Sequence, residues 1–257
     1  MAGNEKEIAK FLVLNKSKIS LGQLGVVKSV GAPNLSKKGC IEISNIKDVE
    51  RCLATEDSRK KADIYINNHG VSLKQFGSSF LYNRLQRANI LEVFVLLGFH
   101  NPESMLQRLD KEVAEFHKGN LDRRNRPWQD FFSEEDFKAL VKFLMVQGSP
   151  NVGFSSHPAE FILEAPADNI SGSNINVFTF DEYFKEYKDK IKIAIRRQWV
   201  GQDSESEHGR AVSLIKKPGN APWVFNNVIG EPRNGWMKDF PSKDKKTVYF
   251  LMIEKER

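Results

Sequence analysis

The chain has 257 residues, of which 40% are hydrophobic and 28% charged, and its formal net charge is +6. This length can bury a substantial core in one large domain or two, and the positive charge favours an anionic partner. There is no apolar run long enough to span a bilayer and no signal-peptide pattern at the start, so we expect a cytoplasmic protein without a membrane partner.

The first predicted elements are a helix in the segment NEKEIAKFL and a strand at residues 39–43. A polar connecting region then leads to KKADIYINNHGVSLKQ, residues 60–75. Here NNHG contains residue types that tolerate positive φ, and it separates two strand-like runs, so we expect a β-hairpin.

A two-residue turn at Asn68 and His69 pairs Asp63 with Lys74, and a four-residue loop at 67–70 gives the same pairing. A three-residue loop instead places Asp63 opposite Gln75. Because side chains alternate along a strand, the hairpin has a buried face and a polar face. The buried face has Ile64, Ile66, Val71 and Leu73, and the polar face has Asp63, Tyr65, Ser72 and Lys74.

An Asp opposite a Lys is commonly an ordinary cross-strand ion pair, which stabilises by about 0.2–1 kcal/mol. The sparse polar face favours a second interpretation. Ala62-Asp63, followed after eight residues by Ser72-Leu73-Lys74, resembles the signature of the PD-(D/E)xK nucleases. Many type II restriction endonucleases carry this signature on a hairpin.

The resemblance implies a Mg²⁺ site that hydrolyses phosphodiester bonds. Asp63 and the backbone carbonyl of Leu73 would be metal ligands, and Lys74 would orient or help to deprotonate the attacking water. Ser72 stands where the family has Glu or Asp, and is counted with the catalytic group by position. The missing carboxylate could come from Glu7, or from Glu5, whereas Glu92 lies far along the next predicted helix.

That next helix is expected at residues 80–97, with Gly98 as its end. Its polar residues, with Gln75 at the end of the hairpin, are candidates for contact with DNA near the scissile phosphate. These candidates are Gln75, Asn83, Arg84 and Arg87.

A helical region is expected at 101–148. Asn101 and Pro102 begin one helix that ends at Gly119, and Ser133 begins a second that ends at Gly148. The loop between them contains Arg123, Arg124 and Arg126. A solvated connection and contact with DNA phosphates are equally good interpretations of this basic loop.

The C-terminal part is predicted to contain strands at 159–165, 211–217 and 246–255, and one helix that begins with a capping box of Thr179 and Glu182. That helix is expected to continue to Trp199, with Arg196, Arg197 and Gln198 in its last turn. Favourable interaction of these cations with the helix dipole is preferred over nucleic-acid contact. In the loop at 219–236, Arg233 and Asn234 are residue types that read base edges, although a turn explains PRNG equally naturally and is preferred.

The expected fold is α/β, a mixed β-sheet flanked by helices with a PD-(D/E)xK nuclease-like core and additional C-terminal strands and a helix. We expect a catalytic core at 1–100, a helical region with a basic loop at 101–148, and a C-terminal α+β part at 149–257 that recognises DNA. The expected function is that of a Mg²⁺-dependent type II restriction endonuclease acting on double-stranded DNA. A cognate DNA methyltransferase would be encoded in the same system, and a homodimer is compatible with the sequence.

Two alternatives stay open. One is a repair or mismatch-nicking nuclease on the same core, and the other is a DNA-binding protein without catalytic activity, which the absence of an acid at Ser72 keeps in play. The sequence contains no HExxH motif, Walker loop or dinucleotide fingerprint, and its two cysteines form no metal-ligand pattern.

Overall fold

A computed structural model describes residues 5–36, 39–53, 57 and 59–256 of the chain. The chain divides into two compact units, and each is built from two separate segments. Unit 1 takes residues 1–79 and 141–190, and unit 2 takes 80–140 and 191–256. This differs from the three consecutive regions expected from sequence, because the chain leaves unit 1 after Ser79 and returns to it at Val141.

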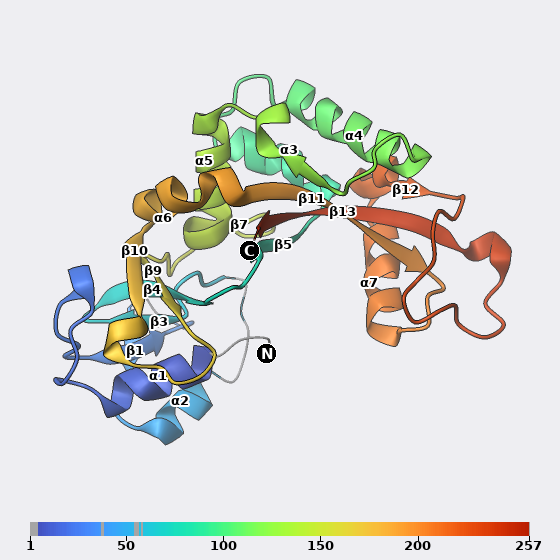
Figure 1. The fold of residues 1–257 in the computed structure, drawn as a ribbon. Coiled ribbons are helices and arrows are strands. Elements are labelled where there is room, and N and C mark those ends of the chain that lie inside the picture. The colour runs from blue at the N-terminus through green and yellow to red at the C-terminus, as the bar shows by residue number, and fades with distance from the viewer. Residues whose placement is uncertain (1–4, 37–38, 54–56, 58, 257) are drawn as a thin grey trace. The chain divides into compact units, whose positions relative to one another are not determined.

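Unit 1 is organised around a six-stranded sheet with the order β10-β9-β4-β3-β1-β2 (Figure 1). The strands are β1 (Val30–Pro33), β2 (Cys40–Glu42), β3 (Ile64–Ile66), β4 (His69–Gln75), β9 (Phe161–Ala165) and β10 (Asn176–Thr179). β4 and β9 are parallel, and the other neighbours are antiparallel. The expected α/β class with a mixed sheet flanked by helices is therefore confirmed.

One face of this sheet is apolar and is covered by helices α1 (Glu5–Leu14) and α2 (Ile46–Cys52). Ile8 and Leu12 of α1 pack with Ile64 and Leu73 in one buried cluster. Helix α6 (Phe180–Tyr187) packs against β9 and β10 and places tyrosine hydroxyls on a glutamate of β9. The hydrophobic alternation of the strands thus fixes which hairpin face turns towards α1 and which carries polar groups.

The hairpin forms with a register two residues from the expected one. Its two-residue turn is Asn67–Asn68, with φ of 52° and 68°, and Ile66 pairs with His69. Positive φ at both central residues is the requirement of a type I′ turn. The Asn67 side chain fixes this choice, because it accepts from the Lys28 N–H at 2.8 Å and donates to the Val26 carbonyl at 2.8 Å.

The pairing ends at Ile64 with Val71, and the Asp63 N–H donates to the Val71 carbonyl at 2.9 Å. The Asp63 carboxylate accepts from the Ser72 hydroxyl, and the expected pairing of Asp63 with Lys74 is not formed. Because the shift is by two residues, each side chain stays on the face expected for it.

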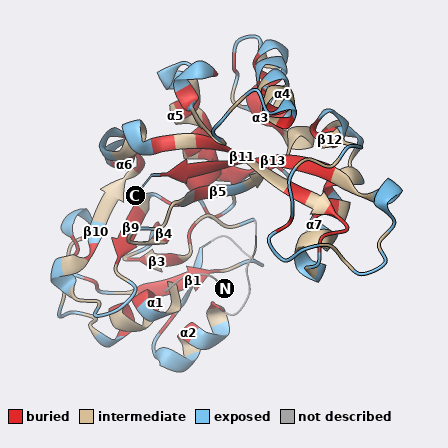
Figure 2. Cartoon of the chain, turned by 45° about the vertical axis from the view of Figure 1, so that its right-hand side comes forward, coloured by how far each residue is buried: buried red, intermediate tan, exposed pale blue. Residues whose placement is uncertain are grey.

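Unit 2 contains a second sheet with the order β12-β13-β11-β6, and β5 also pairs with β13. The strands are β5 (Phe80–Leu85), β6 (Asn125–Pro127), β11 (Ile191–Val200), β12 (Val224–Phe225) and β13 (Lys246–Lys255). β11 and β13 pair along ten residues each, from Ile191 with Lys255 to Val200 with Lys246, and Figure 2 shows β13 buried along its length. The helices of this unit are α3 (Arg87–Leu96), α4 (Pro102–Lys118) and α7 (Glu205–Ile215).

A further helix, α5 (Glu134–Lys142), carries the chain from unit 2 back to unit 1 and continues as a π-helix at Phe143–Gln147. The short strands β7 (Gly148–Ser149) and β8 (Gly153–Phe154) follow it. No described helix is both long and apolar enough to cross a membrane.

Three secondary-structure predictions were wrong. Residues 80–85 form a strand before α3, residues 191–200 form β11 instead of continuing α6, and residues 205–215 form a helix where a strand was expected at 211–217. Short apolar runs fit a helix or a strand, and here long-range pairing with β13 selects the strand for β5 and β11. The capping box of Thr179 and Glu182, helix α4 ending before Gly119, and strands β9 and β13 are confirmed.

Candidate active site

Asp63, Ser72 and Lys74 lie on the polar face of the hairpin. Asp63 immediately precedes β3, and its Oδ2 accepts from the Leu73 backbone N–H at 2.7 Å and from the Ser72 hydroxyl at 3.3 Å. The peptide N–H groups of Lys61 and Ala62 do not continue the pairing with β4, because both donate to the His157 carbonyl, each at 2.9 Å. The Asp63 carboxylate therefore takes the place of a strand carbonyl where the β3–β4 ladder ends.

The Leu73 carbonyl points to the same side of β4 as Asp63. The Gly70 carbonyl accepts from Glu160 and the Phe76 N–H donates to Ala165, so the even-numbered residues of β4 bond towards β9. The N–H and C=O of Leu73 consequently face β3. This strand geometry places one carbonyl oxygen beside the Asp63 carboxylate, as the resemblance implies for a cation site.

A second lysine belongs to this cluster and was missed by the sequence analysis. The ammonium of Lys61 donates to the Leu144 carbonyl at 2.7 Å. The pKa of Lys61 is lowered to about 8, first by burial and then by the positive charge of Lys74, while the negative charge of Asp63 opposes both. In the described part of the chain no hydrogen bond or ion pair engages the Lys74 ammonium, so it is available to an anion or to water.

Glu164 is a missed carboxylate on the same face. It lies on β9 directly beside Lys74 and is 2% exposed. Its two oxygens accept from the hydroxyls of Tyr183 and Tyr187, each at 3.1 Å. Burial, followed by the Glu164 charge, raises the pKa of Tyr187 to about 12, so this hydroxyl stays a donor at neutral pH. The sequence signal for Glu164 is its position inside the apolar segment FILEA, because a charged residue in a buried strand usually has a partner.

The structure does not bring Glu7 to this face. Glu7 is exposed on α1, which packs on the opposite, apolar face of the sheet, and it pairs with Lys10 at 2.9 Å. The helical position of Glu7 follows from Ile8 and Leu12, whose burial turns the acidic residue to solvent. Glu92 is exposed on α3 of unit 2.

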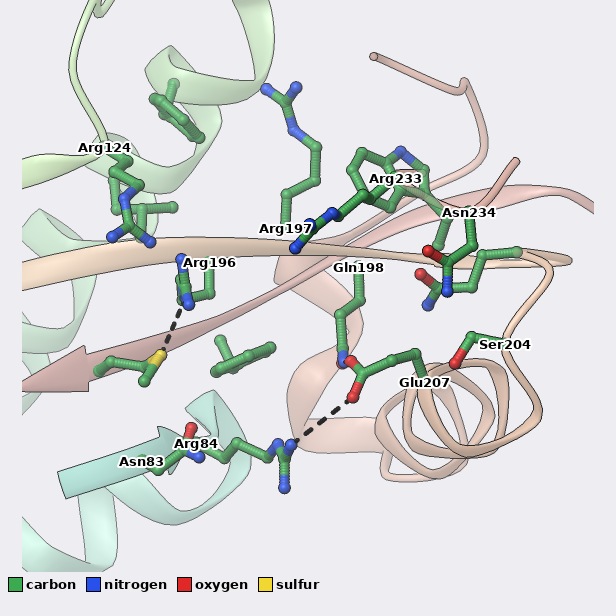
Figure 3. A pocket seen from close by; sticks show the side chains of 16 residues that line it. Asn83, Arg84, Arg124, Arg196, Arg197, Gln198, Ser204, Glu207, Arg233 and Asn234 are labelled. Atoms are coloured by element: carbon green, nitrogen blue, oxygen red, sulfur yellow. Dashed lines mark hydrogen bonds and ion pairs between the residues drawn. The ribbon is translucent and has the colours of Figure 1, made fainter. Parts of the chain in front are cut away.

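The predicted DNA contacts are distributed over both units. Gln75 ends β4 in unit 1 and is half-buried. Five of the others line one pocket of about 770 Å³ in unit 2 (Figure 3), namely Asn83, Arg84, Arg124, Arg233 and Asn234. Arg123, Arg124 and Arg126 line a second hollow of unit 2 with Lys192.

Two of the predicted contacts are engaged in structural pairs within unit 2. Both ends of the Arg87 fork donate to Asp110 at 2.7 Å, and its third nitrogen donates to the Gly219 carbonyl at 2.8 Å. Arg126 forms ion pairs with Glu112 and Asp130. These contacts explain both arginines by the packing of α3, α4 and β6, without a DNA partner.

Arg196, Arg197 and Gln198 line the first pocket as well. The prediction that they end a helix is wrong, because they belong to β11.

Comparison of the chain with family models, with curated proteins and with solved structures found no match.

Proposed function

We propose that the chain is a Mg²⁺-dependent nuclease that cleaves double-stranded DNA, of the type II restriction kind. The observation that supports the proposal is the bond of the Asp63 carboxylate to the Leu73 backbone at the end of the β3–β4 ladder, with Lys74 as the next residue along β4. The net charge of +6 agrees with a polyanionic substrate.

The donor set suits a hard cation. Mg²⁺ takes oxygen ligands, keeps several waters and requires only one or two carboxylates. Asp63 Oδ1, the Leu73 carbonyl and water would hold it, because Asp63 Oδ2 already accepts from Leu73. No group of three or more His, Cys, Asp or Glu side chains suited to a metal ion occurs among the described residues, so water would supply most of the coordination. When bound, the ion would polarise the phosphoryl oxygen and acidify a water molecule.

The lysines have distinct roles in this proposal. Lys74 holds the attacking water or the non-bridging phosphate oxygen by charge-assisted hydrogen bonding. Lys61 is fixed by the Leu144 carbonyl, and its charge is partly suppressed above about pH 8, so it sets the electrostatic environment of Lys74. Glu164, engaged by two tyrosines, balances the positive charge of Lys74 from the neighbouring strand.

A second candidate function is DNA binding without catalysis. It is favoured by one observation, that Asp63 has a structural task as the acceptor for Leu73. Among nucleases, a repair or mismatch-nicking enzyme uses the same chemistry on a different substrate. A homodimer and a cognate methyltransferase belong to the restriction form of the proposal.

The test uses purified protein and unmethylated plasmid. We expect discrete fragments with Mg²⁺ and none with EDTA. Nicking confined to mismatched or damaged duplex would support the repair enzyme, and a mobility shift without any cleavage would support the non-catalytic binder. Methylation of the plasmid by a methyltransferase from the same gene cluster should abolish the fragments.

A further inference from the structure

The geometry points to the arginine-lined pocket of unit 2 as a binding site for consecutive phosphates of a nucleic-acid backbone. This inference rests on the proposed function in one respect only, namely that the phosphates are those of duplex DNA. The pocket has a volume of about 770 Å³ and lies entirely within unit 2.

The pocket forms along a strand edge. β6 pairs with β11 only from Lys192 to Ala194, and the Ile195 N–H then donates to the Arg124 carbonyl. Beyond that point the pocket collects side chains from both faces of β11, and Figure 3 shows Arg197 and Gln198 leaving the strand in opposite directions. Loop residue Arg233 and strand residue Arg84 complete the positive lining.

Charge is strongly one-sided in this lining. Five arginines contribute to it, and the single acidic residue is Glu207. Glu207 is shared, since it accepts from Gln198, forms an ion pair with Arg210 and lies 3.9 Å from Arg84. The pocket therefore retains an excess of positive charge that a multiply charged anion would neutralise.

Buried hydrogen-bond donors without acceptors indicate which chemical groups a ligand of this pocket would supply. Arg84 Nε, Arg124 Nη1 and Gln202 Nε2 are buried nitrogens of the lining for which the described residues supply no hydrogen-bond acceptor. Each is a donor only, and a buried donor without an acceptor is costly. Phosphate oxygens are acceptors that suit guanidinium forks. One buried acceptor, Gln198 Oε1, also lacks a partner and would take a base amino group or water.

Two of the arginines, Arg197 and Arg124, are held in place before a ligand arrives. Arg197 donates to the Tyr249 hydroxyl at 3.1 Å and lies over the Phe116 ring at 5.1 Å, and Arg124 pairs with Glu254 at 3.1 Å. Arg84 has a φ of 64°, which is a strained backbone conformation for a side-chain-bearing residue. Fixed guanidinium groups lose less entropy on binding, which favours a dedicated site over a solvated charge cluster.

The experiment measures binding of labelled duplex DNA in EDTA, where no cleavage occurs, as a function of salt. Arg233→Gln changes an exposed loop residue, and Arg84→Gln changes a half-buried residue whose Nε is buried. Arg108→Gln is the matched control, because it removes the same charge from an exposed position on α4 of the same unit, outside the pocket lining. Circular dichroism and thermal unfolding establish that each variant is folded.

We expect each pocket variant to weaken binding about tenfold at low salt and to reduce the slope of log affinity against log salt by about 1, while the control changes neither. Arg84→Lys should keep most of the slope and still lose affinity, because the fork is gone. Wild-type affinity and slope in folded Arg233→Gln and Arg84→Gln would overturn the inference, as would tight binding of an acidic protein with no binding of nucleic acid.

A cleavage assay on the same proteins separates the two proposals. If the wild type cuts DNA and both pocket variants bind and cut as it does, the pocket inference fails and the nuclease stands. If the wild type binds DNA through these arginines without cutting it, the nuclease fails and the pocket stands. Equal competition by single-stranded DNA would assign the phosphates to a single strand and would overturn the duplex assignment.

Discussion

Replacing Asp63 with asparagine and with alanine separates two properties of this side chain. One is an acceptor oxygen, which holds the Leu73 N–H at 2.7 Å, and the other is a negative charge on the polar face of the hairpin. Asparagine keeps an acceptor oxygen and removes the charge. Alanine removes both, so the pair of variants distinguishes an architectural aspartate from a catalytic one.

The size of the stability effect follows from burial. Leu73 is 1% exposed, so removing the acceptor leaves a donor with little access to water. Leaving such a donor without a partner costs about 1–3 kcal/mol. We therefore expect Asp63→Ala to lower the free energy of unfolding by about 2 kcal/mol and Asp63→Asn by less than about 1 kcal/mol.

Denaturant unfolding measures the stability of both variants, and plasmid cleavage with Mg²⁺ measures their activity. We expect both variants to be inactive, with DNA binding in EDTA retained by Asp63→Asn. Lys74→Gln should likewise bind without cutting. Cleavage by Asp63→Asn at the wild-type rate would refute the catalytic role of Asp63. Equal stability of the two Asp63 variants would refute its structural role as the acceptor for the Leu73 N–H.

Two further predictions concern stability. The pKa of Lys61 is lowered to about 8 from 10.5, so between these values the unfolded chain binds more protons and stability rises with pH. We expect the free energy of unfolding to rise by up to about 3 kcal/mol over that interval, as measured by denaturant unfolding at both pH values. The Lys61→Met variant should lack this rise. A difference in stability between the two proteins that does not change with pH would contradict the prediction. Arg87→Met should destabilise unit 2 by about 3 kcal/mol, because it removes both guanidinium hydrogen bonds to the Asp110 carboxylate. DNA affinity should stay at the wild-type level. A slope of log affinity against log salt that is reduced as in the pocket variants would show that Arg87 contacts DNA.

Local signals predicted the elements that local chemistry determines. The capping box at Thr179 and Glu182 and the glycine that ends α4 are interactions within a few residues, and both are confirmed. The continuation of α6 into residues 191–200 was wrong because IKIAIRRQWV satisfies helical and strand patterns alike. The ten-residue pairing of β11 with β13 decides it, and the two segments are far apart in sequence.

The hairpin shows a further limit of prediction from sequence, which concerns the register of the two strands. Its faces were predicted correctly because alternation survives a shift of two residues, whereas its register was not. The turn moved to Asn67–Asn68 because the Asn67 side chain bonds to backbone groups of residues 24–28. The Asp63 carboxylate consequently accepts from Ser72 and from the Leu73 backbone N–H, in place of the cross-strand ion pair with Lys74 that the sequence suggested.

The missed members of both candidate sites share one physical cause. Glu164 reaches Lys74 through the parallel pairing of β4 and β9, and Lys61 is buried by contact with the Leu144 carbonyl. In unit 2, Arg197, which the sequence predicted at the end of a helix, joins Arg84 in one pocket because strands β5 and β11 both pair with β13. Residue type indicates what a side chain can bind, but the pairing of strands decides which side chains come together. Arginines with separate sequence signals therefore become an argument for one phosphate site, because Arg84 Nε and Arg124 Nη1 are buried in the same pocket without acceptors.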